Sequence, residues 1–167
     1  MMVTTPNAAE SEPLERPRIL GPILALDLGS KRVGAAVSDP TQLAISRLEF
    51  IPRSNWKQLL RDVRDLIQRF DAKTLVIGFP LSLDGSEGSA ATSARETARK
   101  FALSLNLDIY LQDERLTSTE AKENLSAEGY KSGAIADLVD SESAAIILRD
   151  FIGDGQHRML IARPFDR

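Results

Sequence analysis

The sequence predicts an α/β domain in which helices cover both faces of a mixed β-sheet. Near the start of the periodic region, three β-type stretches follow one another with short links, which favours antiparallel strands. Further along, short apolar stretches alternate with segments of helical periodicity, as expected when helices pack on a sheet. The chain has 167 residues, which is enough for one domain with a buried core.

Five stretches are predicted to be strands. The first is the apolar run ILGPILALDLG, residues 19–29, which ends in glycine as a buried strand would. VGAAVSD, residues 33–39, follows after a short turn, and residues 43–51 can form a third strand. TLVIG, from residue 74, is rich in β-branched side chains, and DIYLQDE, from residue 108, is the fifth strand.

Four segments are predicted to be helices, which gives the order βββαβαβαα. The first places seven apolar side chains on one face, after the candidate caps Ser54 and Asn55: Trp56, Leu59, Leu60, Val63, Leu66, Ile67 and Phe70. The second has its own apolar face: Ala94, Ala98, Phe101, Ala102 and Leu105. Residues 117–129 form the third helix, stopped by Gly129, and residues 138–152 form the last.

The chain is predicted to hold one folded domain between two tails. Residues 1–18 contain three prolines and no apolar periodicity, so we expect a disordered tail there. The folded domain would span residues 19–153, and residues 154–167 would form a C-terminal tail. No apolar run approaches the roughly 20 residues that span a bilayer, and no signal peptide is visible, so we expect a cytoplasmic protein.

Composition excludes several kinds of active site. The chain has no cysteine, which rules out disulfides, thiolate metal sites and cysteine nucleophiles. Its one histidine is His157, near the end of the chain, so a Ser-His-Asp triad is a poor hypothesis. The net charge is -3 and the sequence pI is about 5.3, so any contact with nucleic acid must be local or mediated by cations.

Three carboxylates are the candidate catalytic residues. Asp27 ends the first strand in LALDLGSKRVG, where an acid is costly unless it is paired or binds a metal. Glu114 ends the fifth strand, and Asp140 is placed at the start of the last helix on its apolar face. Taken singly, each has a plain alternative: a strand-end turn for Asp27, a solvated acid for Glu114, and a favourable helix-dipole position for Asp140.

Taken together, the three acids predict a metal site. Sites in open α/β sheets gather beyond the strand ends, where these carboxylates would converge and repel one another. Two Mg²⁺ or Mn²⁺ ions, which prefer oxygen ligands, would neutralise them and activate water for phosphodiester hydrolysis. The glycines that follow Asp27, at positions 29 and 34, are interpreted as giving room for a phosphate backbone.

Candidate substrate contacts are basic side chains and one polar loop. Arg95, four residues before Arg99 on the second helix, and Arg115, beside Glu114, are candidate phosphate contacts, although such residues also form ordinary solvated surfaces. Residues 78–88 form a long polar loop without a Walker A pattern, equally consistent with a flexible surface loop and a substrate-binding one.

Four segments in this order resemble the YqgF family, also called RuvX: ALDLGSKRVGAAVSD, VIGFPLSLDGSEG, QDERLTSTEA and VDSESAAIIL. The resemblance implies the RNase H-like fold, a five-stranded mixed sheet flanked by helices. It implies catalytic and metal-binding roles for Asp27, Glu114 and Asp140, and substrate contacts from Arg32 and the loop around Gly85. Ala25 departs from the family pattern, which usually has glycine there, and residues 46–47 stand where it often has proline.

The resemblance implies a nuclease that matures the 5′ end of small-subunit ribosomal RNA, with precursor RNA as partner and a monomer or weak homodimer as its state. A Holliday junction resolvase would use the same acids but needs a two-fold dimer. An ATP-binding protein of the actin and sugar-kinase type would need a second such domain, for which the chain is too short. A non-catalytic nucleic-acid-binding or regulatory module is the third alternative, and the three acids argue against it.

Overall fold

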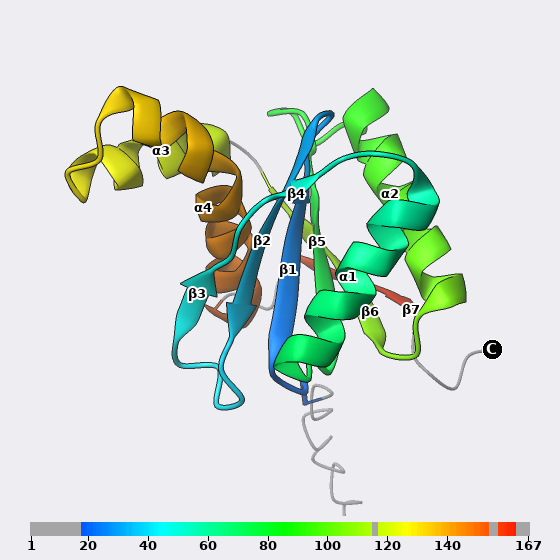
Figure 1. The fold of residues 1–167 in the computed structure, drawn as a ribbon. Helices are drawn as coiled ribbons and strands as arrows, with labels where there is room; N and C mark the ends of the chain where they lie inside the picture. The colour runs from blue at the N-terminus through cyan, green and yellow to red at the C-terminus, as the bar shows by residue number, and fades with distance from the viewer. Residues whose placement is uncertain (1–17, 115–116, 154–156, 163–167) are drawn as a thin grey trace, which may run out of the picture.

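A computed structural model of the protein describes residues 18–114, 117–153 and 157–162. Strands and helices follow one another along the chain as shown in Figure 1: β1 (Ile23–Leu28), β2 (Arg32–Ser38), β3 (Ile45–Arg47), β4 (Ile51–Pro52), α1 (Trp56–Phe70), β5 (Thr74–Phe79), α2 (Ser89–Ser104), β6 (Asp108–Asp113), α3 (Thr117–Ala127), α4 (Ser132–Gly153) and β7 (Arg158–Ala162).

All the strands belong to one mixed sheet in the order β3-β2-β1-β5-β6-β7, with β4 pairing separately with β2. The β1–β2 pair is antiparallel and places Asp27 opposite Gly34. The neighbours β1, β5 and β6 are parallel to one another, whereas β7 runs antiparallel to β6. The ends of β1, β5 and β6 therefore lie at the same edge of the sheet, which we call the carboxyl edge.

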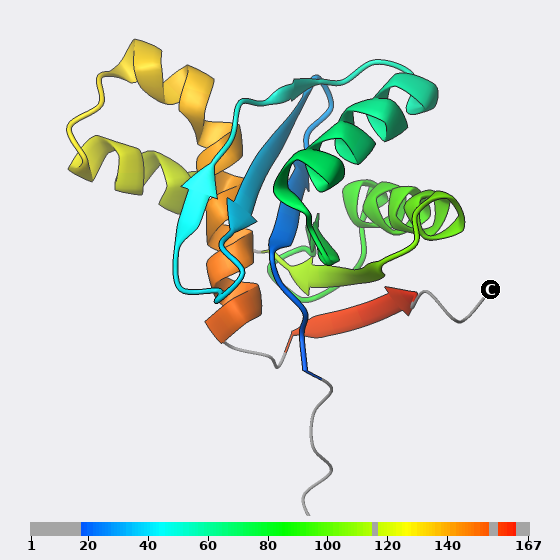
Figure 2. The same ribbon diagram turned by 60° about the horizontal axis from the view of Figure 1, so that its bottom comes forward.

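Helices cover the two faces of the sheet unequally. One face packs against α1 and α2, whose buried side chains include Leu59, Val63 and Phe101. The other face packs against the single helix α4, through Ala144, Ile147 and other side chains. The views in Figures 1 and 2 show α3 lying against the first half of α4, so that the α3–α4 hairpin stands beyond the sheet.

Local sequence explains where these helices begin and end. The Asn55 side chain caps α1 by accepting a hydrogen bond from the Gln58 amide at 2.9 Å, as the sequence predicts. After α3, Gly129 adopts a left-handed conformation with φ of 93°. That conformation favours glycine, and the Tyr130 amide then bonds back to the Leu125 carbonyl at 3.1 Å, which ends the helix as predicted.

Within the residues that the structure describes, the sheet has seven strands rather than the five that were predicted. Residues 43–51 do not form one strand: β3 and β4 both pair with β2, but residues 49–50 between them leave the ladder. The added strand β7 lies inside the predicted C-terminal tail, and its five residues gave no pattern of their own because β7 depends on pairing with β6. The prediction of disorder for residues 1–17 lies outside the described residues.

The last helix begins earlier than predicted, which changes the position of Asp140. Because α4 starts at Ser132, Asp140 lies more than two turns inside the helix, not in its first turn. The prediction that Asp140 opens the helix is therefore wrong, and a favourable helix-dipole position cannot explain it. Among the helices of the described ranges, none is both long enough and apolar enough to cross a membrane.

Candidate functional site

Strand alternation brings two of the candidate acids and two glycines to the sheet face that α4 covers. The neighbouring side chains that alternate onto that face belong to its apolar core: Ala25, Ala36, Val76 and Tyr110. Asp27 and Gly78 come two residues after a core residue on β1 and β5, and Gly34 comes two residues before one on β2. Glu114 follows β6 directly and is 8% exposed.

Gly34 allows α4 to approach β2 at the level of Asp140. A Cβ atom on Gly34 would overlap the main-chain carbonyl of Asp140, so no other residue fits there without moving the helix. Since Gly34 is the register partner of Asp27, this contact holds Asp140 beside Asp27. The interpretation that Gly34 gives room for a phosphate backbone is wrong, because the backbone that approaches it is the protein's own.

Gly78, predicted to begin the polar loop, lies instead in β5 and plays the same part for Glu114. A Cβ atom on Gly78 would lie 2.5 Å from Glu114 Oε2 and 2.7 Å from Ile147 Cδ1. Glu114 itself is held by its amide, which donates to the Phe79 carbonyl at 3.0 Å. Its side chain reaches the carboxyl group of Asp27, with which it forms a hydrogen bond. The structure therefore brings Asp27 together with both Glu114 and Asp140.

The electrostatics of the site disfavour the charged forms of two acids. Burial, reinforced by the negative charge of Asp140, raises the pKa of Asp27 from its ordinary value of 3.8 to about 6, and the hydrogen bond with Glu114 offsets this only in part. Burial also raises the pKa of Asp140, while the Arg32 guanidinium lowers it. A strongly raised carboxyl pKa at a sheet edge is typical of a functional site.

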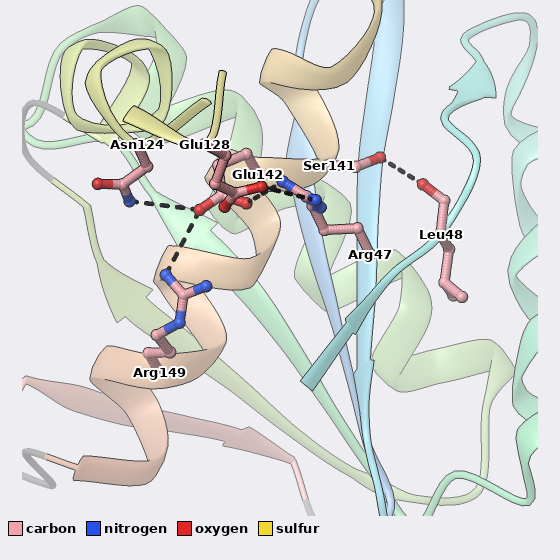
Figure 3. Close-up of polar contacts among 7 residues, drawn as sticks. All are labelled: Arg47, Leu48, Asn124, Glu128, Ser141, Glu142 and Arg149. Carbon is pink, nitrogen blue, oxygen red and sulfur yellow. Dashed lines mark hydrogen bonds and ion pairs between the residues drawn. The ribbon is translucent and has the colours of Figure 1, made fainter. Parts of the chain in front are cut away.

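A second group of charged side chains, shown in Figure 3, fixes α4 close to Asp140. Glu142, 1% exposed, accepts a hydrogen bond from Arg47 Nη1 at 3.0 Å and lies 3.4 Å from Arg149 Nη1. Asn124 of α3 donates to the same carboxylate at 3.3 Å. One residue earlier, the Ser141 hydroxyl donates to the Leu48 carbonyl at 2.5 Å. These contacts join α4 to α3 and to the edge strand β3.

Sequence reasoning did not identify Glu142 as a structural residue. The available signal was an acid followed by the apolar run SAAIIL, which implies that this acid is buried and needs a cation. Its partner Arg47 lies 95 positions away in the chain, and nothing in the sequence pairs the two residues.

Of the predicted substrate contacts, Arg32 lies beside the acids. Its guanidinium donates to the Ala136 carbonyl at 3.4 Å, lies 3.8 Å from Asp137 and stacks over the Phe50 ring at 4.5 Å. It also lies near enough to Asp140 to lower the pKa of that carboxyl group. With a side chain 40% exposed, Arg32 retains an accessible guanidinium at the carboxyl edge.

Arg95 does not join the acids. Its guanidinium pairs with Glu87 at 2.5 Å and stacks over the Phe79 ring at 4.9 Å. Phe79 belongs to the core on the α1–α2 face, so Arg95 lies on the side of the sheet away from Asp27. Gly85, with φ of 85°, forms an exposed turn in the loop that follows β5. Arg115 lies outside the described residues.

The donor atoms of the site suit a hard divalent cation, since all three acids supply carboxylate oxygens. Burial and the charge of Asp140 raise the pKa of Asp27, and a positive charge bound nearby would oppose both and favour its ionised form. The three acids are not gathered tightly, however: within the described ranges, no group of three His, Cys, Asp or Glu side chains is placed to enclose one metal ion.

The comparisons with known proteins agree on one family. The family model described as "RuvX: Holliday junction resolvase" matches residues 21–154. A relative from Gloeothece citriformis (strain PCC 7424) named "Putative pre-16S rRNA nuclease" is 38% identical, over 83% of this chain and 91% of its own length. A relative of the same name from Anaeromyxobacter sp. (strain Fw109-5) is 34% identical, over 80% of this chain and 97% of its own length.

A solved structure confirms the predicted fold. The structure titled "T. thermophilus RuvC in complex with Holliday junction substrate" matches with a TM-score of 0.53, covering 83% of this chain and 98% of its own. At 13% identity, this likeness concerns the fold alone. The mixed sheet flanked by helices is therefore the RNase H-like fold.

Proposed function

This chain belongs to the RuvX family, and we propose that it is a nuclease that hydrolyses RNA phosphodiesters and matures the 5′ end of the small-subunit ribosomal RNA. The observation that carries the proposal is the position of Asp27, a partly buried acid that interacts with two further acids, Glu114 and Asp140. Relatives that match most of the chain bear the name of a pre-16S rRNA nuclease, which supports RNA as the substrate.

The proposal includes two Mg²⁺ or Mn²⁺ ions held by Asp27, Glu114 and Asp140. Asp27 is hydrogen-bonded to Glu114 and its pKa is raised by the charge of Asp140, so the three acids could act together on such ions. When bound, such ions activate a water molecule and stabilise the leaving oxygen. No histidine or cysteine is needed, in keeping with a chain that has one histidine and no cysteine.

The chain's own residues prepare the site for this chemistry. Asp27 is ionised above a pH of about 6, so its full negative charge is available at neutral pH. Gly34 and Gly78 hold Asp140 and Glu114 against it at close range. We propose that Arg32, beside Asp140, contacts a substrate phosphate, and that the loop around Gly85 lies along the RNA.

Cleavage of a precursor small-subunit ribosomal RNA fragment tests the proposal. Wild-type protein in Mn²⁺ or Mg²⁺ should cut the fragment, and EDTA or Asp27→Asn should prevent cutting. Glu142→Gln is the matched control, since it removes a buried negative charge two residues after Asp140 on α4 while leaving all three acids in place. Cutting by Asp27→Asn at the wild-type rate would refute the proposed site.

Branched DNA is the second candidate substrate, because the matching family model is described as a Holliday junction resolvase. Symmetric cutting of a four-way junction requires a two-fold dimer. A junction should therefore be run beside the RNA fragment, with the oligomeric state measured at the same protein concentration. Cutting of the junction with no cutting of the RNA would favour the resolvase.

A further inference from the structure

A path of basic side chains leads away from the acidic site along α1. Six exposed or partly exposed residues form this path. Two precede α1, three lie on α1 and one lies on α2: Lys31, Arg53, Lys57, Arg61, Arg64 and Lys100. We call this set the cationic stripe. None of the six forms an ion pair with any residue that the structure describes, whereas Arg32, Arg47, Arg95 and Arg149 all do.

Hydrogen bonds connect the stripe to the turn that follows Asp27. Arg53 Nη1 donates to the Gly29 carbonyl at 2.8 Å, and the Arg53 amide donates to the Lys31 carbonyl at 2.9 Å. The start of α1 is therefore fixed to the β1–β2 turn at the carboxyl edge. The stripe thus begins at the turn that follows Asp27 and continues along α1 on the other face of the sheet, where α1 lies in Figure 1.

Helical spacing makes the stripe straight. Lys57, Arg61 and Arg64 follow one another at intervals of four and three residues, which places them on one face of α1 over about 10 Å. The acids of α1 are Asp62 and Asp65, which line a hollow against residues 47–52, and Asp65 lies one turn after Arg61. Glu96, one turn before Lys100 on α2, is an exposed acid at the other end of the stripe, so the stripe is bordered by acids but keeps an excess of positive charge.

The side chains along the stripe suit a phosphate backbone rather than unpaired bases. Proteins that bind single strands add exposed aromatic rings on which the bases stack. The one aromatic ring beside the stripe in the described structure is Trp56, which packs on Phe101 at 4.8 Å and has Lys100 Nζ 5.6 Å from its centre. That ring is partly buried and already covered, which leaves contact with phosphates as the stripe's chemistry.

We propose that the cationic stripe binds the phosphate backbone of a double-helical segment of the RNA substrate, adjoining the strand that enters the acidic site. This inference rests on the proposed function and adds a docking surface to it. A local stripe of this kind also explains how a chain with a net charge of -3 can hold a polyanion.

The salt dependence of RNA binding tests the stripe separately from cleavage. Asp27→Asn protein would be titrated with a blunt RNA duplex of about two helical turns, at several salt concentrations. Each lost phosphate contact should reduce the slope of log affinity against log salt by about 0.9. In Asp27→Asn protein, the three further changes Lys57→Gln, Arg61→Gln and Arg64→Gln together should reduce this slope by about 2 to 3. They should also weaken RNA binding at least about tenfold near 0.15 M salt.

The matched control removes three positive charges elsewhere: Lys73→Gln, Lys122→Gln and Lys131→Gln, also in Asp27→Asn protein. We expect its slope to match that of Asp27→Asn alone. Equal effects of the two triple variants, or no effect of the stripe variant, would overturn the proposal, as would tighter binding of single strands than of the duplex. Because Arg64 also donates to the Ser104 carbonyl at 2.9 Å, Lys57→Gln with Arg61→Gln serves as a second variant, with a slope change of about 2.

The binding result and the cleavage result separate the two proposals. A stripe effect in protein that never cuts RNA would leave the docking surface standing and refute the nuclease. Cutting of the precursor with no stripe effect on binding would leave the nuclease standing and refute the docking surface.

Discussion

Two partly or fully buried carboxylates on adjoining elements are treated in opposite ways by this protein. Glu142 on α4 lies against two arginines and an asparagine, all within 3.4 Å of its carboxylate. Asp27 on β1 has acids as its charged neighbours, and in the described structure no lysine or arginine forms an ion pair with it. Arginine side chains therefore neutralise the buried acid Glu142 next to the site, whereas the described structure places no such cation against Asp27.

The different surroundings of Glu142 and Asp27 indicate different roles for the two carboxylates. A buried ion pair such as that of Glu142 holds elements in place, here α4, α3 and β3 (Figure 3). A buried acid among acids costs stability and persists where a ligand or a reaction needs its charge. We therefore read Glu142 as structural and Asp27 as functional, and the predictions below separate the two.

Catalysis should show the largest difference. Asp27→Asn removes the charge on which the metal-dependent reaction depends, so we expect the rate of RNA cleavage to fall by at least about a thousandfold, or about 4 kcal/mol in activation free energy. Glu142→Gln should stay within about tenfold of the wild-type rate. Single-turnover cleavage of the precursor fragment measures both, and equal losses in the two variants would contradict the distinction.

Gly34→Ala tests whether close packing holds Asp140 beside Asp27. The added methyl group would overlap the Asp140 carbonyl, so α4 must move, at a cost of about 3 kcal/mol in the free energy of unfolding and with loss of cleavage. Gly133→Ala is the matched control, because no atom lies within 4 Å of the added Cβ and alanine favours the helix. Urea unfolding should separate the two variants, and equal stability would contradict the packing argument.

Arg47→Met should destabilise the fold by about 3 kcal/mol, because it leaves the buried Glu142 carboxylate with only the half-exposed Arg149 as a cation. Arg47→Met combined with Glu142→Leu should recover most of that loss, since a buried ion pair is readily replaced by apolar groups. Urea unfolding of the single and double variants measures the difference. If the double variant is no more stable than Arg47→Met, the loss of stability in Arg47→Met does not come from the unpaired Glu142 carboxylate.

The pH dependence of stability should mark Asp27 in protein kept free of metal by EDTA. Its pKa is about 6 in the folded protein and is ordinarily 3.8, so between those values the unfolded chain has lost a proton that the folded chain keeps. The free energy of unfolding therefore falls as pH rises from about 4 to about 6, by about 3 kcal/mol at full effect. Asp27→Asn should lack this loss. The difference in free energy of unfolding between Asp27→Asn and the wild-type protein should therefore grow between about pH 4 and about pH 6 and stay constant above that.

Denaturation at fixed pH values from 4 to 8 would follow this difference. If the stability of Asp27→Asn relative to the wild-type protein stays constant, or falls as pH rises, the raised pKa of Asp27 is contradicted.

The sequence predicted the parts of the fold whose signals are local. The amphipathic pattern and Asn55 located α1, and the apolar runs located the three parallel strands. It did not predict the start of α4, because residues 132–137, SGAIAD, are almost all exposed and have no apolar face of helical period. The short strand β7 escaped because its existence depends on β6.

The three acids could be named from the sequence because each stands out against an apolar strand or helix and because their segments resemble a known family. What brings them together could not be named. Gly34 meets Asp140, and Gly78 meets Glu114, across long sequence separations that leave no local pattern. The Arg47–Glu142 pair has the same property.

Thermal unfolding with and without Mn²⁺ at pH 8 tests the central claim, that the acids around Asp27 hold a divalent cation. A ligand at about 100 times its dissociation constant stabilises the fold by about 2.7 kcal/mol, which for a chain of this size raises the midpoint by about 5–10 °C. We predict that rise for the wild-type protein and for Glu142→Gln, and none for Asp27→Asn. An equal rise in Asp27→Asn, or no rise in any of the three, would contradict the claim.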